Sequence, residues 1–146
     1  MKVSVYTLLL AATSTIAVPA TVKREGQFSI SGLRARKALD HTMSFILLDT
    51  TTPAADIPIE CNMIWPSNSA PDQNAACGSD SEYLLKFPDG FPGIGHFTLA
   101  IERVTAEPIG GRAYLDENDG KWNCVDNPEP HVAKDCHYDG VYTIPL

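Results

Sequence analysis

The sequence predicts an all-β protein, a compact antiparallel β-barrel or sandwich of about eight or more short strands with a pair of disulfide bonds. Three observations lead to this prediction. Apolar residues alternate with polar ones over short stretches, as in strands that bury one face. The 10 glycines and 11 prolines of the 146 residues gather between many of these stretches, where turns are expected. The 4 cysteines are an even number, which in a secreted chain indicates a disulfide framework.

The N-terminal segment has the three parts of a secretory signal peptide. Lys2 precedes the apolar stretch VSVYTLLLAA, which is followed by small residues up to Ala17. The apolar stretch is too short for a stable membrane anchor. We therefore expect residues 1–17 to be a signal peptide that is cleaved after Ala17, or alternatively after Ala20. The predicted localisation is secreted and extracellular, with association with the cell wall as one form of it.

A dibasic pair, Lys23-Arg24, follows the predicted signal peptide within a few residues. Such a pair is typical of a processing site for a kexin-type protease. We therefore expect residues 18–24 to be a short pro-segment and residues 25–146 to be a single β-barrel domain. Cleavage removes basic residues and leaves a more acidic mature chain.

Strands are expected where the alternation or a short apolar run occurs. The clearest is His96–Val104, in which Phe97, Leu99 and Ile101 share one face. The other expected strands lie at Phe28–Ile30, Met43–Leu48, Ile57–Ile64, Tyr83–Phe87, Arg112–Leu115, Lys121–Val125 and Val141–Leu146. Only Gly32–Leu39 is expected to form a helical turn or two.

An acidic turn is expected at Asp116–Gly120. Its Asp-Gly step lies between two predicted strands, which favours a β-hairpin. The segment also has the composition of a calcium loop, but Gly120 is fifth rather than sixth and no helices flank it. We therefore expect a plain turn.

The four cysteines allow three pairings. We favour Cys61–Cys77 with Cys124–Cys136, because each pair brackets a segment rich in Pro, Asn, Ser or Asp. Such segments have little regular structure of their own, and a crosslink holds them in place. A rival metal site would use Cys124, His131, Cys136 and His137. Its spacing does not fit a compact zinc finger, so we expect no metal and no cofactor.

Charge and motifs limit the classes of function. The net charge of −7 disfavours binding to nucleic acid or to an anionic membrane. Motifs of serine hydrolases, zinc proteases and nucleotide-binding loops are missing from the sequence, so we assign no catalytic residues. A small secreted hydrolase such as a ribonuclease is the enzymatic alternative. Its groups would come from Glu60, Glu82, His96, Arg103 and His137, whose spacing does not enforce convergence.

Four residues are candidates for binding a partner. Trp65 lies just before Pro66, in the segment bracketed by the first cysteine pair, where an exposed aromatic side chain would suit a protein contact. Arg34, Arg36 and Lys37 form a basic cluster that can meet an acidic partner or remain solvated.

Several segments together resemble a known family. They are FSISGL, MSFILLD, C-x-M-I-W, EYLLKF, HFTLAIE and GVYTIPL, along with the spacing of the two cysteine pairs. The chain is similar in these to the secreted fungal family typified by the major allergen of Alternaria. This resemblance implies a compact β-barrel with locally paired disulfides. It also implies a role outside the cell, as an allergen or as an elicitor or effector of plant defence, without a generally accepted enzymatic mechanism.

The resemblance implies two kinds of partner, a host extracellular defence protein or a small phenolic ligand. The allergen has a further N-terminal cysteine that links two chains, whereas Glu25–Glu60 contains none here. We therefore expect a monomer or a non-covalent dimer. The predicted function is that of a secreted, allergen-like effector that binds plant extracellular proteins without catalysis. The alternatives are a barrel that binds a phenolic ligand and a secreted ribonuclease.

Overall fold

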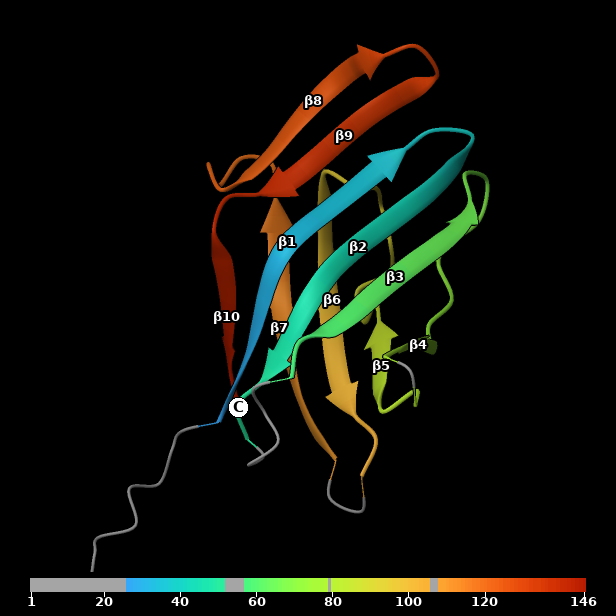
Figure 1. Ribbon diagram of the computed structural model, residues 1–146. Helices are drawn as coiled ribbons and strands as arrows, with labels where there is room; N and C mark the ends of the chain where they lie inside the picture. The colour runs from blue at the N-terminus through green and yellow to red at the C-terminus, as the bar shows by residue number, and fades with distance from the viewer. Residues whose placement is uncertain (1–25, 52–56, 79, 106–107) are drawn as a thin grey trace, which may run out of the picture.

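The computed structural model describes residues 26–51, 57–78, 80–105 and 108–146, and its regular structure is all β (Figure 1). The predicted signal peptide and pro-segment lie outside the described residues. The strands are β1 (Gln27–Lys37), β2 (Asp40–Asp49), β3 (Ile59–Pro66), β4 (Ala75–Cys77), β5 (Tyr83–Lys86), β6 (His96–Arg103), β7 (Ile109–Asp116), β8 (Trp122–Glu129), β9 (Val132–Tyr138) and β10 (Val141–Pro145). Nowhere in the described ranges is there a helix long and apolar enough to cross a membrane.

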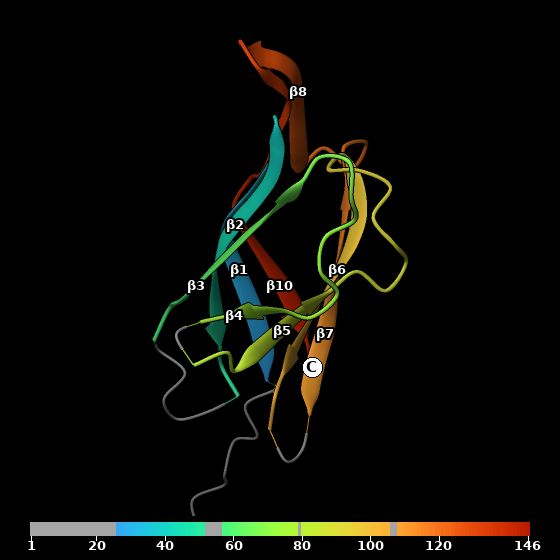
Figure 2. The ribbon, with the colours of Figure 1, turned by 90° about the vertical axis from the view of Figure 1, so that its right-hand side faces the viewer.

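The strands form two antiparallel sheets that face each other (Figure 2). The six-stranded sheet has the order β3-β2-β1-β9-β8, and β10 also pairs with β1. The N-terminal half of β1 pairs with β10, and its C-terminal half pairs with β9. The four-stranded sheet has the order β4-β5-β6-β7. The predicted all-β class is confirmed.

Of the two predicted architectures, barrel or sandwich, the structure has the sandwich, because the sheets are not closed into a barrel. No ladder of hydrogen bonds joins the two sheets within the described ranges. At the β7 edge of the sandwich, β10 packs against Gly111. A Cβ atom at Gly111 would lie 2.2 Å from Ile144 Cγ2, so only a glycine permits this approach.

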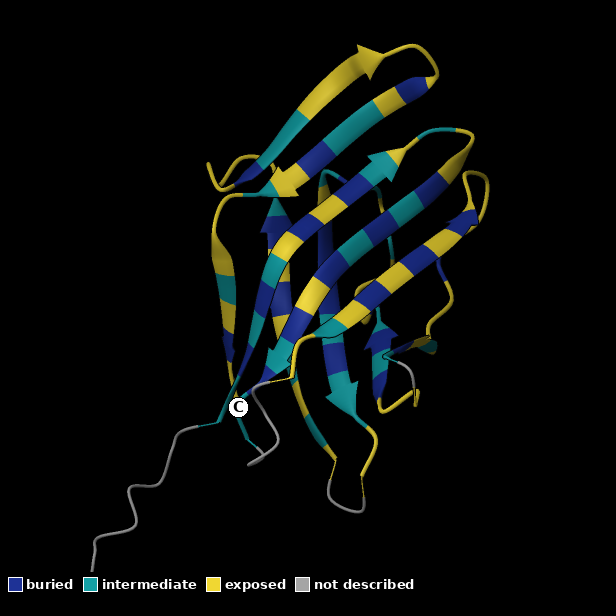
Figure 3. Cartoon of the chain, in the orientation of Figure 1, coloured by how far each residue is buried: buried dark blue, intermediate teal, exposed yellow. Residues whose placement is uncertain are grey.

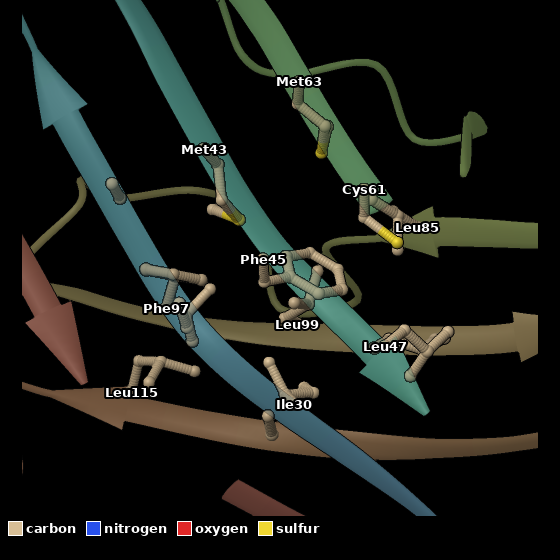
Figure 4. Close-up of a cluster of buried hydrophobic side chains, with 14 of the residues drawn as sticks. Ile30, Met43, Phe45, Leu47, Cys61, Met63, Leu85, Phe97, Leu99 and Leu115 are labelled. Carbon is tan, nitrogen blue, oxygen red and sulfur yellow. The ribbon is translucent and has the colours of Figure 1, made fainter. Parts of the chain in front are cut away.

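The core lies between the inner faces of the two sheets. Buried and exposed residues alternate along most strands, as Figure 3 shows. Figure 4 shows the centre of the core, where side chains of both sheets interdigitate. It includes Ile30, Phe45 and Leu47 from the six-stranded sheet and Leu85, Leu99 and Leu115 from the other, all at most 3% exposed.

The predicted helical turn at Gly32–Leu39 is wrong, because residues 32–37 continue strand β1. The register of β1 against β2 shifts between Ser31 and Arg34, which marks a β-bulge. Gly32 has a φ of +61°, a left-handed conformation that glycine adopts without strain. The bulge moves the buried set from Phe28 and Ile30 to Leu33 and Ala35, so the apolar spacing no longer has a period of two.

All eight predicted strands are present, and β4 and β9 are strands that the sequence analysis missed. The segment between Cys124 and Cys136 is a β-hairpin of β8 and β9, with its turn at Pro130-His131, and is not an irregular loop. The acidic turn at Asp116–Gly120 exists, but it does not close a hairpin. It carries the chain from β7 in one sheet to β8 in the other.

Both disulfides have the favoured local pairing. Cys61–Cys77 joins β3 to β4 and so links the two sheets covalently. Cys124–Cys136 connects directly opposed residues of β8 and β9. The rival metal site is thereby wrong, since both of its cysteines are oxidised.

Candidate interaction site on the hairpin face

The projecting hairpin of β8 and β9 is the centre of the candidate site. It extends beyond the ends of β6 and β7 (Figures 1 and 2), so much of it has no opposing strand. Residues 125–131 are all exposed. We use the name hairpin face for the solvent side of β1, β9 and β8, made of Arg34, Arg36, Val125, Pro128, Glu129, Asp135 and His137.

Ion pairs organise the charged half of the hairpin face. Arg34 and Asp135 pair side by side, with Nε donating to Oδ1 at 2.9 Å and Nη2 to Oδ2. Arg36 Nε lies 3.1 Å from Asp135 Oδ2, and Arg36 Nη2 also donates to Glu129. Two guanidinium groups therefore meet two carboxylates, and the expected basic cluster is largely neutralised on the hairpin face.

The pairing also shifts the ionisation of these groups. The hydrogen bond from Arg34 lowers the pKa of Asp135, and burial, which opposes this, is outweighed. The same bond raises the pKa of Arg34. Both groups are thus charged over the physiological pH range, and together with Arg36 and Glu129 they form a row of paired charges, which we call the charge ladder.

Beside these ion pairs lies a hollow of about 370 Å³, lined by Arg34, Val125, Pro128, Asp135 and His137. A second hollow of about 570 Å³ lies at the hairpin tip, along residues 127–133. Val125 is 52% exposed although it is aliphatic. The hollow thus places one exposed aliphatic side chain beside a row of paired charges.

The structure separates the four predicted partner-binding residues. Arg34 and Arg36 lie together on the hairpin face. Lys37 is exposed at the end of β1 but faces the other side of the sheet, in register with His41. Trp65 is only 5% exposed, so the expected exposed aromatic residue is in fact part of the core. The reason is that β3 continues through Trp65, whose side chain packs edge-on against Phe91 with ring centroids 5.3 Å apart.

Sequence analysis missed the hairpin-face residues Val125, Pro128, Glu129 and Asp135. It placed Val125 at the end of a predicted strand and interpreted the other three as part of a Pro- and Asp-rich loop. One signal for a strand was present in the sequence. From Val132 to Tyr138, every second residue lies on the same side, and the cysteine Cys136 is one of these residues. The polar residues between them hid the pattern, because neither side of the projecting hairpin is covered for its full length.

The residues of the ribonuclease alternative do not converge. His96 is on the outer face of the four-stranded sheet, with Nδ1 3.4 Å from Asp116. His137 is on the outer face of the other sheet, with Nε2 3.3 Å from Asp139. Arg103 faces the interior and pairs with Asp49. In the part of the chain that the structure describes, no hydrogen bond or ion pair joins any two of Glu60, Glu82, His96, Arg103 and His137.

A second group of polar atoms lies inside the sandwich. His41 on β2 and Trp65 on β3 are directly opposed, with ring centroids 5.4 Å apart. Both nitrogens of the His41 ring and Nε1 of Trp65 are buried without a hydrogen-bond partner among the described residues. Burial lowers the pKa of His41, with a smaller effect from Lys37, so this imidazole is neutral at neutral pH.

The fold and the two disulfides define a class of protein, an antiparallel β-sandwich with one bridge between its sheets and one across a projecting hairpin. No known family profile and no curated protein sequence matches the chain. Among solved structures, the chain is similar to the crystal structure of the Alternaria alternata allergen Alt a 1, with a TM-score of 0.57. The match covers 89% of this chain and 94% of that chain at 17% sequence identity. The chain therefore has the fold of this allergen, as the resemblance predicted.

Proposed function

We propose that the chain is a secreted effector that acts without catalysis, by binding an extracellular protein of a plant host through the hairpin face. The observation that carries this proposal is the projecting, disulfide-bonded hairpin, whose exposed Val125 lies beside a fixed ladder of ion pairs. Surfaces of this kind bind other proteins by presenting a preformed shape. The likeness to a fungal allergen and the signal-peptide pattern support a role outside the cell.

Infiltration of the purified mature protein into leaves tests the effector role. We expect a defence response to the oxidised protein and none to reduced and alkylated protein, because both bridges hold the presented shape. The absence of a response to the oxidised protein would contradict the proposal.

Variants at two exposed valines test the location of the binding surface. Val125→Asp places a charge in the apolar hollow, whereas Val141→Asp places the same charge at a 57% exposed valine of β10 in the same sheet. The measurement is the capture of a host protein from leaf extract by the immobilised mature protein. We expect Val125→Asp to lose the host protein that the wild type captures, and Val141→Asp to retain it. Loss or retention by both variants would argue against the hairpin face.

The buried nitrogens of His41 and Trp65 favour one alternative, a binding protein for a small phenolic compound. A hydroxyl group can donate to one imidazole nitrogen and accept from the indole N–H. Titration of the wild type and of a His41→Phe variant with a phenol tests this alternative, with Trp fluorescence as the signal. We expect the wild type to respond more strongly than the variant. Equal responses of the two proteins would remove it.

A further inference from the structure

The outer face of the four-stranded sheet carries a second surface that the hairpin face does not include. Outward-facing residues of β5, β6 and β7 lie in rows set by the strand register. Lys86 pairs with Ala100, and Ala100 pairs with Arg112, so two cations flank one methyl group in a single row. Two strand spacings place their Cα atoms about 10 Å apart.

Small residues make this part of the sheet concave. Ala100 has only a methyl side chain, and Gly110, in the adjacent row opposite Glu102, has no side chain. A hollow of about 390 Å³ lies over them. Its walls include Lys86, Arg112, Glu102 and the amide residues Gln73 and Asn74.

The charges in this hollow are unequal. Lys86 Nζ is 2.7 Å from Glu102 Oε2, so this cation is already paired. Arg112 is exposed and, among the residues that the structure describes, has no carboxylate partner, whereas Arg34, Arg36 and Arg103 each have one. The hollow thus holds a surplus positive charge on a planar group that pairs well with a carboxylate through two hydrogen bonds.

Two further groups fit a sugar. Tyr114 does not line the hollow, but it follows Arg112 by two residues on the same face of β7 and is 59% exposed. Its backbone N–H donates to the Tyr142 hydroxyl at 3.0 Å. An exposed aromatic ring on a sheet offers an apolar surface with a polar tip. Gln73 accepts the N–H of Phe87 through Oε1, which leaves its NH₂ group to donate to a hydroxyl.

We propose that this hollow binds an acidic oligosaccharide built of uronic acid units. In the hollow, a sugar carboxylate pairs with Arg112 over Ala100 and hydroxyl groups bond to the amide of Gln73, while a neighbouring unit of the same oligosaccharide packs its ring on Tyr114 beside the hollow. This ligand class uses the cation, the aromatic ring and the amides together, whereas an acidic peptide needs only the cation. The site does not depend on the hairpin face or on the protein partner proposed for it.

Calorimetric titration of the full mature protein with tetragalacturonate tests the proposal. We expect binding that weakens as salt is added, with no binding of the neutral maltotetraose. Arg112→Gln removes the charged partner and should weaken binding about tenfold or more. The charge-matched control Lys121→Gln removes an exposed cation that lies outside this hollow and outside the hairpin face, and it should leave binding unchanged.

Three results would overturn the proposal: no binding of tetragalacturonate, equal binding by the wild type and Arg112→Gln, or equal affinity for tetraglutamate. The last result would identify a general carboxylate site. Circular dichroism checks that the variants fold. The Arg112→Gln variant should still capture the host protein, because Arg112 lies outside the hairpin face. The two proposals can therefore fail independently.

Discussion

Arg103 on β6 and Asp49 at the end of β2 form an ion pair that spans the two sheets, with 2.7 Å between Nη1 and Oδ2. The Tyr83 hydroxyl donates to the same carboxylate oxygen at 2.9 Å. Thr51 donates to the other oxygen through its backbone N–H and its hydroxyl. Asp49 is only 2% exposed. Its pKa is lowered although burial opposes ionisation, because these hydrogen bonds and Arg103 outweigh burial.

Replacing Asp49 by alanine should leave Arg103 as an uncompensated buried charge. We expect the free energy of unfolding to fall by about 3–5 kcal/mol, measured by urea denaturation. Tyr83→Phe removes a single hydrogen bond and should cost about 1 kcal/mol. A loss for Asp49→Ala no larger than that for Tyr83→Phe would show that the ion pair does not hold the sheets together.

Tyr83 gives the protein an alkaline limit. Burial, with a further contribution from Asp49, raises the pKa of its hydroxyl to about 12, from an ordinary value of 10.0. The folded state therefore holds this proton more tightly than the unfolded state does. Its contribution to stability is complete below pH 10 and is lost between pH 10 and about pH 12.

The difference in melting temperature between the wild type and Tyr83→Phe measures this contribution. We expect the difference to be constant up to about pH 10 and to shrink above it. A difference independent of pH up to pH 12 would contradict the assignment.

His41 should make the protein sensitive to acid. Burial lowers the pKa of its imidazole, so the folded state binds this proton less tightly than the unfolded state. Stability is therefore complete at neutral pH and falls as the pH drops below the ordinary value of 6.5. Lys37 adds to this effect, and Asp40 opposes it.

Urea denaturation of the wild type and His41→Phe between about pH 7 and about pH 5 tests this expectation. The wild type should lose stability relative to the variant across this range. Parallel pH profiles would show that His41 is not the group responsible.

Replacing Gly32 or Gly111 by alanine should destabilise the protein, for different reasons and to different degrees. At Gly32, nothing lies within 4 Å of an added Cβ atom, and only the positive φ is unfavourable, at a cost of about 1–2 kcal/mol. At Gly111 the Cβ atom would collide with Ile144, so the two sheets must separate locally. We expect Gly111→Ala to reduce the free energy of unfolding more than Gly32→Ala. Ser31→Ala, at a half-buried position of β1 where the added strain is absent, is the control and should change it by less than about 0.5 kcal/mol.

Sequence pattern was sufficient for strands that are covered on one side. His96–Arg103 shows this, because its odd-numbered residues face the core and alternate with polar or small ones. The pattern failed at the bulge of β1, where one glycine changes which residues face inward. It failed again at β9, where the hairpin leaves the sandwich and polar residues occupy both sides.

The candidate site could be predicted only in part, because its residues come from segments that are far apart in the sequence. Arg34 and Arg36 stood out as a local basic cluster, but their partners Asp135 and Glu129 lie about a hundred positions later in the chain. Only the pairing of β1 with β9 brings them together. The burial of Trp65 likewise depends on Phe91, from a loop of the opposite sheet.

The affinity of the captured host protein for matched valine variants tests the central claim most directly. Surface plasmon resonance with the purified partner would compare the wild type, Val125→Asp and Val141→Asp. We predict that Val125→Asp raises Kd about tenfold or more, while Val141→Asp stays near the wild type. Equal Kd values for the two variants would contradict the claim that the hairpin face is the binding surface.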